Sequence, residues 1–184
     1  MNTEDLGNSK FLNLLFKPAG VMMGSRFRRW LMNPVKTLRG ADIQPGQTVL
    51  EVGCGTGFFT IPAAKLIGDE GCLVAMDALS DFIKQVSKKV QSADLKNVHV
   101  VKRDALNTGL GVASIDTALL FGVLPWPALP LNLLLPEMHR VLKPEGRLAV
   151  WMFPVSGWVP TSILRSGLFT YMSKQNGVYN YRRC

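Results

Sequence analysis

The chain has 184 residues, enough for one domain with a substantial hydrophobic core. Apolar residues make up 47% of it and charged residues 18%, which excludes a disordered chain. The three cysteines form no C-x-x-C pair and no metal-ligand pattern with the two histidines, so we expect a reduced protein without metal. Its start, residues 1–5, is polar and acidic, unlike a signal peptide, and we expect a cytoplasmic protein.

The net charge of +8 comes from the two flanks of the chain. Residues 1–40 hold seven basic and two acidic residues, and residues 156–184 hold four basic residues and no acid. These flanks are either a solvated surface or a means of attracting an anionic partner or a membrane surface. Both interpretations stay open, and the sequence does not predict an oligomeric state.

From residue 36 onward, strand and helix patterns alternate. Strands are predicted at 48–52, 72–76, 98–101, 115–121 and 147–153, and helices at about 56–67, 81–93 and 131–142. A turn at 143–146 separates the last helix from the fifth strand. Residues 168–173 and 178–183 flank an Asn-Gly pair, which is typical of a hairpin. The pattern predicts one α/β, doubly wound domain: a seven-stranded, mostly parallel sheet that ends in an antiparallel hairpin.

Two charge-free stretches have the length or hydropathy of membrane segments. Residues 117–136 carry no charge over 20 positions but contain four prolines, which would break a spanning helix. We therefore predict a buried strand, a loop and the start of a helix there. Residues 148–164 are divided by Pro154, Gly157 and Pro160 in the same way.

The most informative motif is Glu51-x-Gly53-x-Gly55-x-Gly57, which follows the first predicted strand. Its spacing differs from the G-x-G-x-x-G of dinucleotide sites, and the acid ahead of it favours a ligand with an ammonium group over a pyrophosphate. Asp77 ends the next strand about 20 residues past the turn, where a carboxylate commonly accepts hydrogen bonds from a ribose diol. The alternatives are that the glycines form only a strand-to-helix turn and that Asp77 and Asp104 cap helices.

In these motifs the chain resembles the class I S-adenosylmethionine (SAM)-dependent methyltransferases, with a Rossmann-like methyltransferase domain at 41–184 behind a basic, apolar helical segment at 1–40. The segment 137–148 is similar to the family's R-V-L-K-P-G-G-x-L sequence, with Glu145 in place of a glycine. The resemblance implies SAM as cofactor, with S-adenosylhomocysteine (SAH) as product. It implies that the cofactor-binding residues are Glu51, Gly53, Cys54, Gly55, Thr56, Gly57, Asp77, Ala78, Leu79, Asp104, Ala105, Phe121 and Gly122.

The roles of these residues follow from the family. Glu51 would lie near the methionyl ammonium, and Asp77 would hold the ribose. Asp104 and the Ala105 amide would meet the adenine amine, and Phe121 and Gly122 would lie near the reacting methyl. The sequence indicates no general base, so the catalytic residues are unknown.

The methyl acceptor is expected to be a small, apolar or lipid-like molecule. Met and aromatic residues of the N-terminal segment and of the loop after residue 122 adapt to apolar ligands, although they could equally close the core. The candidates for acceptor contacts are Met22, Met23, Arg26 and Trp126. The resemblance is closest to the branch that includes ubiquinone- and menaquinone-type methyltransferases.

Two other functions stay open. One is a SAM-binding protein without transferase activity. The other is an RNA-directed methyltransferase that uses the basic flanks, but the chain lacks the stacking aromatics and motifs of RNA-binding modules, so we do not expect a nucleic-acid partner.

Overall fold

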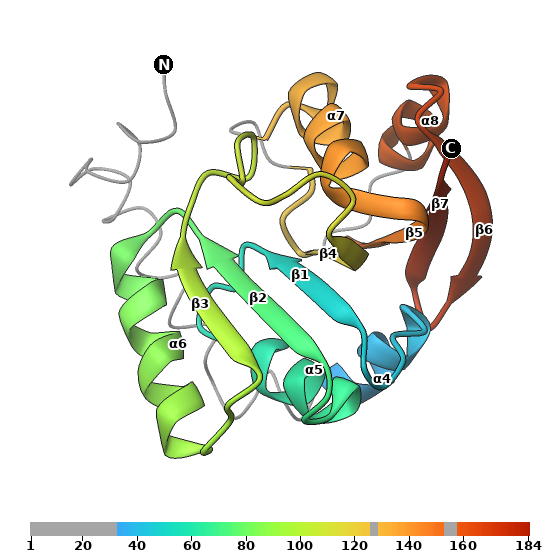
Figure 1. Cartoon of the computed structure of the whole chain (residues 1–184). Coiled ribbons are helices and arrows are strands. Elements are labelled where there is room, and N and C mark those ends of the chain that lie inside the picture. The colour runs from blue at the N-terminus through green and yellow to red at the C-terminus, as the bar shows by residue number, and fades with distance from the viewer. Residues whose placement is uncertain (1–32, 126–128, 153–157) are drawn as a thin grey trace.

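The structure is a computed structural model, and it describes residues 33–125, 129–152 and 158–184 (Figure 1). The candidate acceptor residues Met22, Met23, Arg26 and Trp126 lie outside these ranges.

Within the described residues, seven strands form one sheet in the order β3-β2-β1-β4-β5-β7-β6. The strands are β1 (Thr48–Val52), β2 (Cys72–Asp77), β3 (Val98–Lys102), β4 (Ile115–Phe121), β5 (Leu142–Trp151), β6 (Phe169–Gln175) and β7 (Val178–Arg183). The helices are α4 (Pro34–Gly40), α5 (Thr60–Ile67), α6 (Ser80–Ser92), α7 (Leu131–Val141) and α8 (Trp158–Arg165). Strands β1 to β5 are parallel, and β7 runs antiparallel to both β5 and β6. The predicted fold class is confirmed.

The strand order places a switch point between β1 and β4. The chain passes outward from β1 to β2 and β3, and then returns to the other side of β1 to form β4. In open α/β sheets, ligands bind beyond the carboxyl ends of the strands at such a point. The glycine turn follows β1 directly, so it lies at this edge of the sheet.

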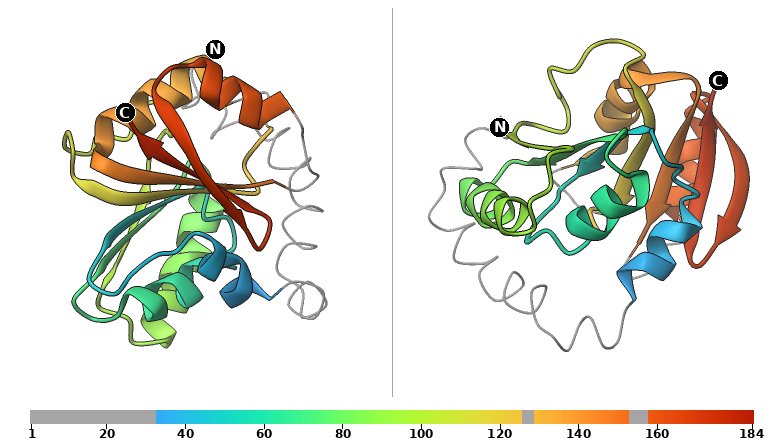
Figure 2. Two further views of the ribbon diagram at one scale, coloured as in Figure 1. Left: turned by 90° about the vertical axis from the view of Figure 1, so that its right-hand side faces the viewer. Right: turned by 60° about the horizontal axis from the view of Figure 1, so that its bottom comes forward.

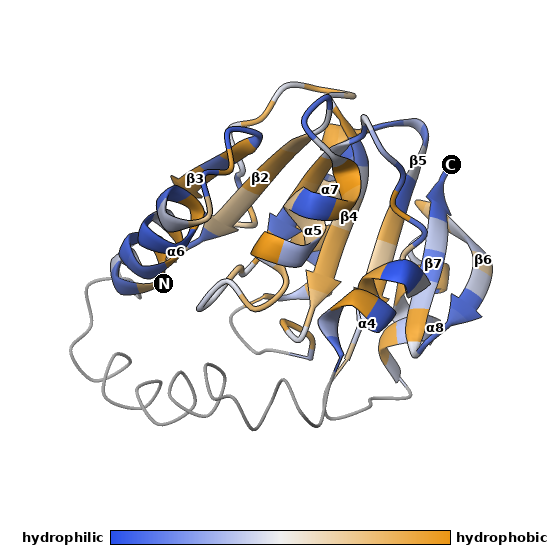
Figure 3. Cartoon of the chain, turned by 90° about the horizontal axis from the view of Figure 1, so that it is seen from below, coloured by the Kyte–Doolittle hydropathy of each residue, from blue (hydrophilic) through white to orange (hydrophobic). Residues whose placement is uncertain are grey.

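Helices cover both faces of the sheet, as Figure 2 shows from two sides. On one face, α7 and α8 pack on Leu120, Val150 and other residues of a shared core. On the opposite face, α4, α5 and α6 cover Leu119, Ala75 and their neighbours. Figure 3 shows the apolar strands β2 and β4 at the centre of the sheet and the mostly polar helix α6 at one side. Burial on both faces explains why the strands are almost continuously apolar in sequence.

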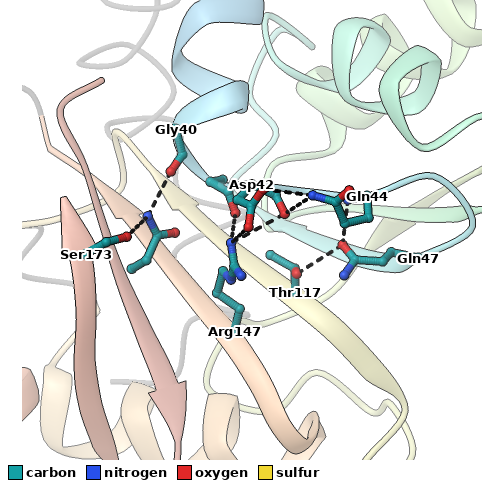
Figure 4. Close-up of polar contacts among 9 residues, drawn as sticks. Gly40, Asp42, Gln44, Gln47, Thr117, Arg147 and Ser173 are labelled. Atoms are coloured by element: carbon teal, nitrogen blue, oxygen red, sulfur yellow. Dashed lines mark hydrogen bonds and ion pairs between the residues drawn. The ribbon is translucent and has the colours of Figure 1, made fainter. Parts of the chain in front are cut away.

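A polar network ties α4 to the amino-terminal edge of β4 and β5, away from the glycine turn (Figure 4). The Arg147 guanidinium donates to the Ala41 carbonyl (2.9 Å) and to Asp42 Oδ2 (2.8 Å). The Asn180 amide donates to the Gly40 carbonyl (2.8 Å). Residues 33–40 of the segment predicted at 1–40 therefore pack directly on the sheet.

Two elements begin at residues other than those predicted. The helix expected from about residue 56 begins at Thr60, because residues 53–59 are used by the turn. The fifth strand begins at Leu142, five residues early, since Leu142 pairs with Ile115 and the chain then bulges before Arg147 pairs with Thr117. The predicted turn at 143–146 forms this bulge, and Glu145 there has a φ of 62°.

Helix α8 was not predicted at all. Its Pro160 was counted as a helix breaker, but Pro160 is the third residue of the helix. An amide in the first turn has no partner within the helix, so proline is tolerated there.

The stretch 117–136 does contain β4 and the start of α7, as predicted. Among the described residues, no helix has the length and hydropathy needed to cross a membrane.

Candidate active site

The glycine turn after β1 is packed against the chain that leaves β4. Gly53 has a φ of 69°, a conformation that favours glycine. A Cβ atom built on Gly53 would lie 2.4 Å from Cγ1 of Val123. Glycine is therefore needed at this position for two reasons, the backbone angle and the close approach of Val123.

Glu51 is the second-last residue of β1 and lies beneath this turn. Its side chain is buried, with 3% of the residue exposed, and the Thr60 hydroxyl donates to Oε2 (2.6 Å). Burial raises the pKa of Glu51 to about 8; the Thr60 hydrogen bond opposes this rise, and the nearby charge of Asp77 adds to it. A cation placed beside Glu51 would therefore favour the ionised carboxylate.

Asp77 ends β2 and connects two loops at the edge of the sheet. The Gly55 amide donates to Oδ2 (2.9 Å), and the Leu79 amide donates to Oδ1 (2.9 Å). Burial raises the pKa of this carboxyl, while the hydrogen bonds from the backbone amides lower it. A carboxylate has about four lone-pair sites, so Asp77 can still accept a hydrogen bond from a ligand beside these amide contacts.

The chain after β3 joins the same edge. The Arg103 amide donates to the Asp77 carbonyl (3.1 Å), and Asp104 Oδ1 accepts from the Leu106 amide (2.9 Å). The alternative role of Asp77 as a helix cap is wrong, because Leu79 is the N-cap of α6. The side chain of Asp104 closes a turn, and Ala105 is buried beside it.

At the end of β4, the two predicted residues differ in what they expose. Phe121 is buried, and its ring packs edge-on against Phe59 with centroids 5.1 Å apart. Gly122 is exposed with a φ of 71°, and its amide donates to the Trp151 carbonyl (2.8 Å). Gly122 is thus accessible to a ligand, whereas the Phe121 side chain belongs to the core.

The structure adds three residues that the sequence did not predict for this site. Thr60 holds Glu51, Val123 covers Gly53, and the Lys89 ammonium donates to the Thr56 carbonyl. They lie 9, 70 and 33 residues from their partners, which is too far for a local sequence pattern to indicate the contact. The carboxyl ends of β1 and β2 and the end of β4 thus form one site, with two buried acids under a glycine turn.

Comparison with known proteins agrees with this geometry. Residues 49–146, more than half of the chain, match the family model described as a methyltransferase domain. The chain belongs to this family. The predicted resemblance to class I SAM-dependent methyltransferases is thereby confirmed, and with it SAM as the cofactor of the family.

Curated relatives and a solved structure give more detail. A demethylmenaquinone methyltransferase from Listeria welshimeri is 35% identical over 66% of this chain and 50% of its own length. One from Geobacillus stearothermophilus is 33% identical over 65% of this chain and 51% of its own. The chain spans about half the length of these relatives. A SAM-dependent methyltransferase from Aquifex aeolicus has the same fold, with a TM-score of 0.73 at 24% identity over 90% of this chain and 96% of that one.

Proposed function

We propose that the chain transfers the methyl group of SAM to a small, apolar acceptor of the quinone type. The observation that carries this proposal is the pair of buried carboxyls, Glu51 and Asp77, around the glycine turn at the switch point of the sheet. Family membership supports the donor, and the names of the relatives support the acceptor class.

The residues at this edge fit a ligand that carries an ammonium group and a ribose. Burial raises the pKa of both the Glu51 and the Asp77 carboxyl, and the charge of Asp77 adds to the rise at Glu51. A cationic ligand offsets that repulsion. We propose that Glu51 meets the ammonium, that Asp77 accepts from the ribose hydroxyls, and that Asp104 and Ala105 lie at the adenine. The remaining predicted contacts would come from Gly53, Cys54, Gly55, Thr56, Gly57, Ala78, Leu79, Phe121 and Gly122.

The reaction needs little acid or base chemistry from the protein. When bound, SAM would supply an activated methyl group. The acceptor would form its bond to that carbon as the sulfur-carbon bond breaks, the sulfur would keep the electron pair, and the acceptor would lose a proton to water. The contribution of the chain is to hold the two reactants in line, which can provide effective molarities of about 10⁵ M or more. Gly122, exposed beside the end of β4, would let the acceptor approach the methyl closely.

The acceptor class rests on the relatives and on the apolar character of the proposed acceptor residues other than Arg26. Met22, Met23, Arg26 and Trp126 remain our candidates for acceptor contacts. A quinone-type ring is flat and apolar, and methionine and aromatic side chains adapt well to such a surface. Contact with a membrane surface through the basic flanks would suit the same acceptor.

Calorimetric titration with SAH tests the donor site. We expect saturable binding by the wild-type chain and weaker binding by Asp77→Asn, with Asp69→Asn, an exposed change, as the matched control. No binding at millimolar SAH would refute the proposal. Methyl transfer to a reduced naphthoquinone would then test turnover: SAH binding without transfer would favour a non-catalytic SAM-binding protein. Tight, steeply salt-dependent binding of RNA would favour the RNA-directed alternative.

A further inference from the structure

A cavity of about 900 Å³ lies between α7 and α8. These helices cover the same face of the sheet and stand side by side (Figures 1 and 2). The cavity begins at Leu124 and Pro125, just past the end of β4, and extends to Arg165 and Leu168 beyond α8. None of the residues assigned above to the donor site lines it.

The wall of this cavity is mainly apolar. Leucines, prolines and Trp158 make up most of the lining, and the described lining contains no acidic side chain. The polar groups are Asn132, Ser162, Ser166 and Arg165, and both Arg165 and Ser166 are exposed at the far end. A long basic side chain typically lays its aliphatic stem on apolar surface and keeps its guanidinium in water. The cavity is therefore suited to an uncharged, apolar occupant that enters from the end opposite Arg165, at Leu124 and Pro125.

That other end meets the site of methyl transfer. Phe121 and Trp151 are paired at the carboxyl ends of β4 and β5, and α7 and α8 each begin after one of these strands. The first residues of both helices, including Trp158, therefore lie at the edge of the sheet that carries the donor site. Helix α8 packs on the face of the sheet through Val159 and Ile163. At 1.5 Å per residue, Trp158 and Arg165 are about 10 Å apart along the helix, which is the length of an extended chain of roughly eight carbons.

We propose that the cavity between α7 and α8 holds the aliphatic side chain of the methyl acceptor, with the acceptor ring at the Leu124 end and the side chain directed toward Arg165. This inference rests on the proposed function, because that function places the reacting ring beside Gly122. Continuity with the transfer site distinguishes this cavity from a general protein-docking surface. The exposed apolar residues Leu133 and Leu164, on the same two helices, do not line it.

Binding of two probes tests the inference in the 184-residue chain. The probes are 2-methyl-1,4-naphthoquinone and 2-decyl-1,4-naphthoquinone, titrated by calorimetry below the concentration at which the decyl compound aggregates. One buried methylene strengthens binding about threefold to fourfold. We expect the decyl probe to bind at least 100-fold more tightly than the methyl probe.

Two variants on α8 test whether the cavity is the source of the tighter binding of the decyl probe. Ser162→Trp fills the cavity with a large side chain and should remove most of the preference for the decyl probe. Leu164→Trp is the matched control, because Leu164 is on the same helix, is exposed and lies outside the lining; it should keep the preference. A cooperative thermal unfolding transition would show that both variants are folded.

SAH titration of the same samples separates this inference from the proposed function. Normal SAH binding with no chain-length preference, or with equal effects of Ser162→Trp and Leu164→Trp, would overturn the cavity assignment alone. Loss of SAH binding in the wild type would instead overturn the proposed function. A wild-type dimer that Ser162→Trp dissociates, measured by sedimentation, would identify the occupant as a second copy and also overturn the assignment.

Discussion

Replacing Gly53 by alanine perturbs the donor site in a way that the structure makes quantitative. Two costs arise at Gly53: its φ of 69°, and the 2.4 Å approach of Val123 Cγ1 to a new Cβ. Gly167 provides a matched control, because it has a φ of 70° and nothing within 4 Å of a new Cβ. The difference between the two substitutions therefore isolates the contact with Val123.

The expected magnitudes follow from these two geometries. A left-handed conformation costs a non-glycine residue about 1–2 kcal/mol, and both variants carry this cost. Overpacking against Val123 adds about 1–3 kcal/mol at Gly53 alone. In a chain of this size, 1 kcal/mol corresponds to about 2–4 °C in Tm. Gly53→Ala should thus melt about 2–12 °C below Gly167→Ala.

Thermal unfolding and SAH titration measure the two consequences. We expect Gly53→Ala to bind SAH at least about tenfold more weakly than Gly167→Ala, because Val123 and the turn must move apart by roughly 1 Å. Adding Val123→Ala to Gly53→Ala should recover most of the difference in Tm, since the obstructing atom is removed. Equal Tm values for Gly53→Ala and Gly167→Ala would refute the packing of the turn that we describe.

Three further substitutions test the buried polar groups. Asp77→Ala removes the acceptor for the Gly55 and Leu79 amides and should lower the free energy of unfolding, measured with denaturant, by about 2–4 kcal/mol. Asp77→Asn should be closer to wild type. No loss of stability in Asp77→Ala would contradict a stabilising role for these two hydrogen bonds. Glu51 keeps its proton in the folded state up to a pKa of about 8, whereas the unfolded chain releases it near 4.5, so stability should fall as the pH rises between these values. In Glu51→Gln, the free energy of unfolding should fall by a few kcal/mol less over this pH range than in the wild type. An unchanged pH profile would show that Glu51 is already ionised. Tyr181 Oη is buried without a hydrogen-bond partner among the described residues. Tyr181→Phe should therefore leave the midpoint of denaturant unfolding unchanged or raise the free energy of unfolding by about 1 kcal/mol. A clear loss of stability would mean that a partner exists.

Elements with a strong local pattern were predictable from sequence. The residues of β1 were predicted without error, and the Asn-Gly turn correctly placed the β6-β7 hairpin. The start of β5 and all of α8 were not, because both depend on partners distant in sequence. Leu142 extends β5 by pairing with Ile115. Helix α8 is held by Val159 and Ile163, which pack in a core shared with residues of β4 and β5.

The same distinction between local patterns and distant partners applies to the residues of the candidate site. The acids Glu51, Asp77 and Asp104 could be found because each follows or ends a predicted strand, and parallel strands end at the same edge of a sheet. The partners of these acids could not be found. Thr60 beside Glu51 and the Gly55 amide on Asp77 depend on how the turn folds back.

The sequence by itself determined the alternation of strands and helices, the glycine turn, and the family to which they belong, because these features depend on neighbouring residues and fixed spacings. Only the tertiary structure decided that Glu51 is buried deeply enough to raise its pKa, that Val123 requires a glycine at position 53, and that α7 and α8 enclose a cavity beside β4. Burial, close approach and enclosed volume are properties of segments brought together from distant parts of the chain, and no local pattern records them.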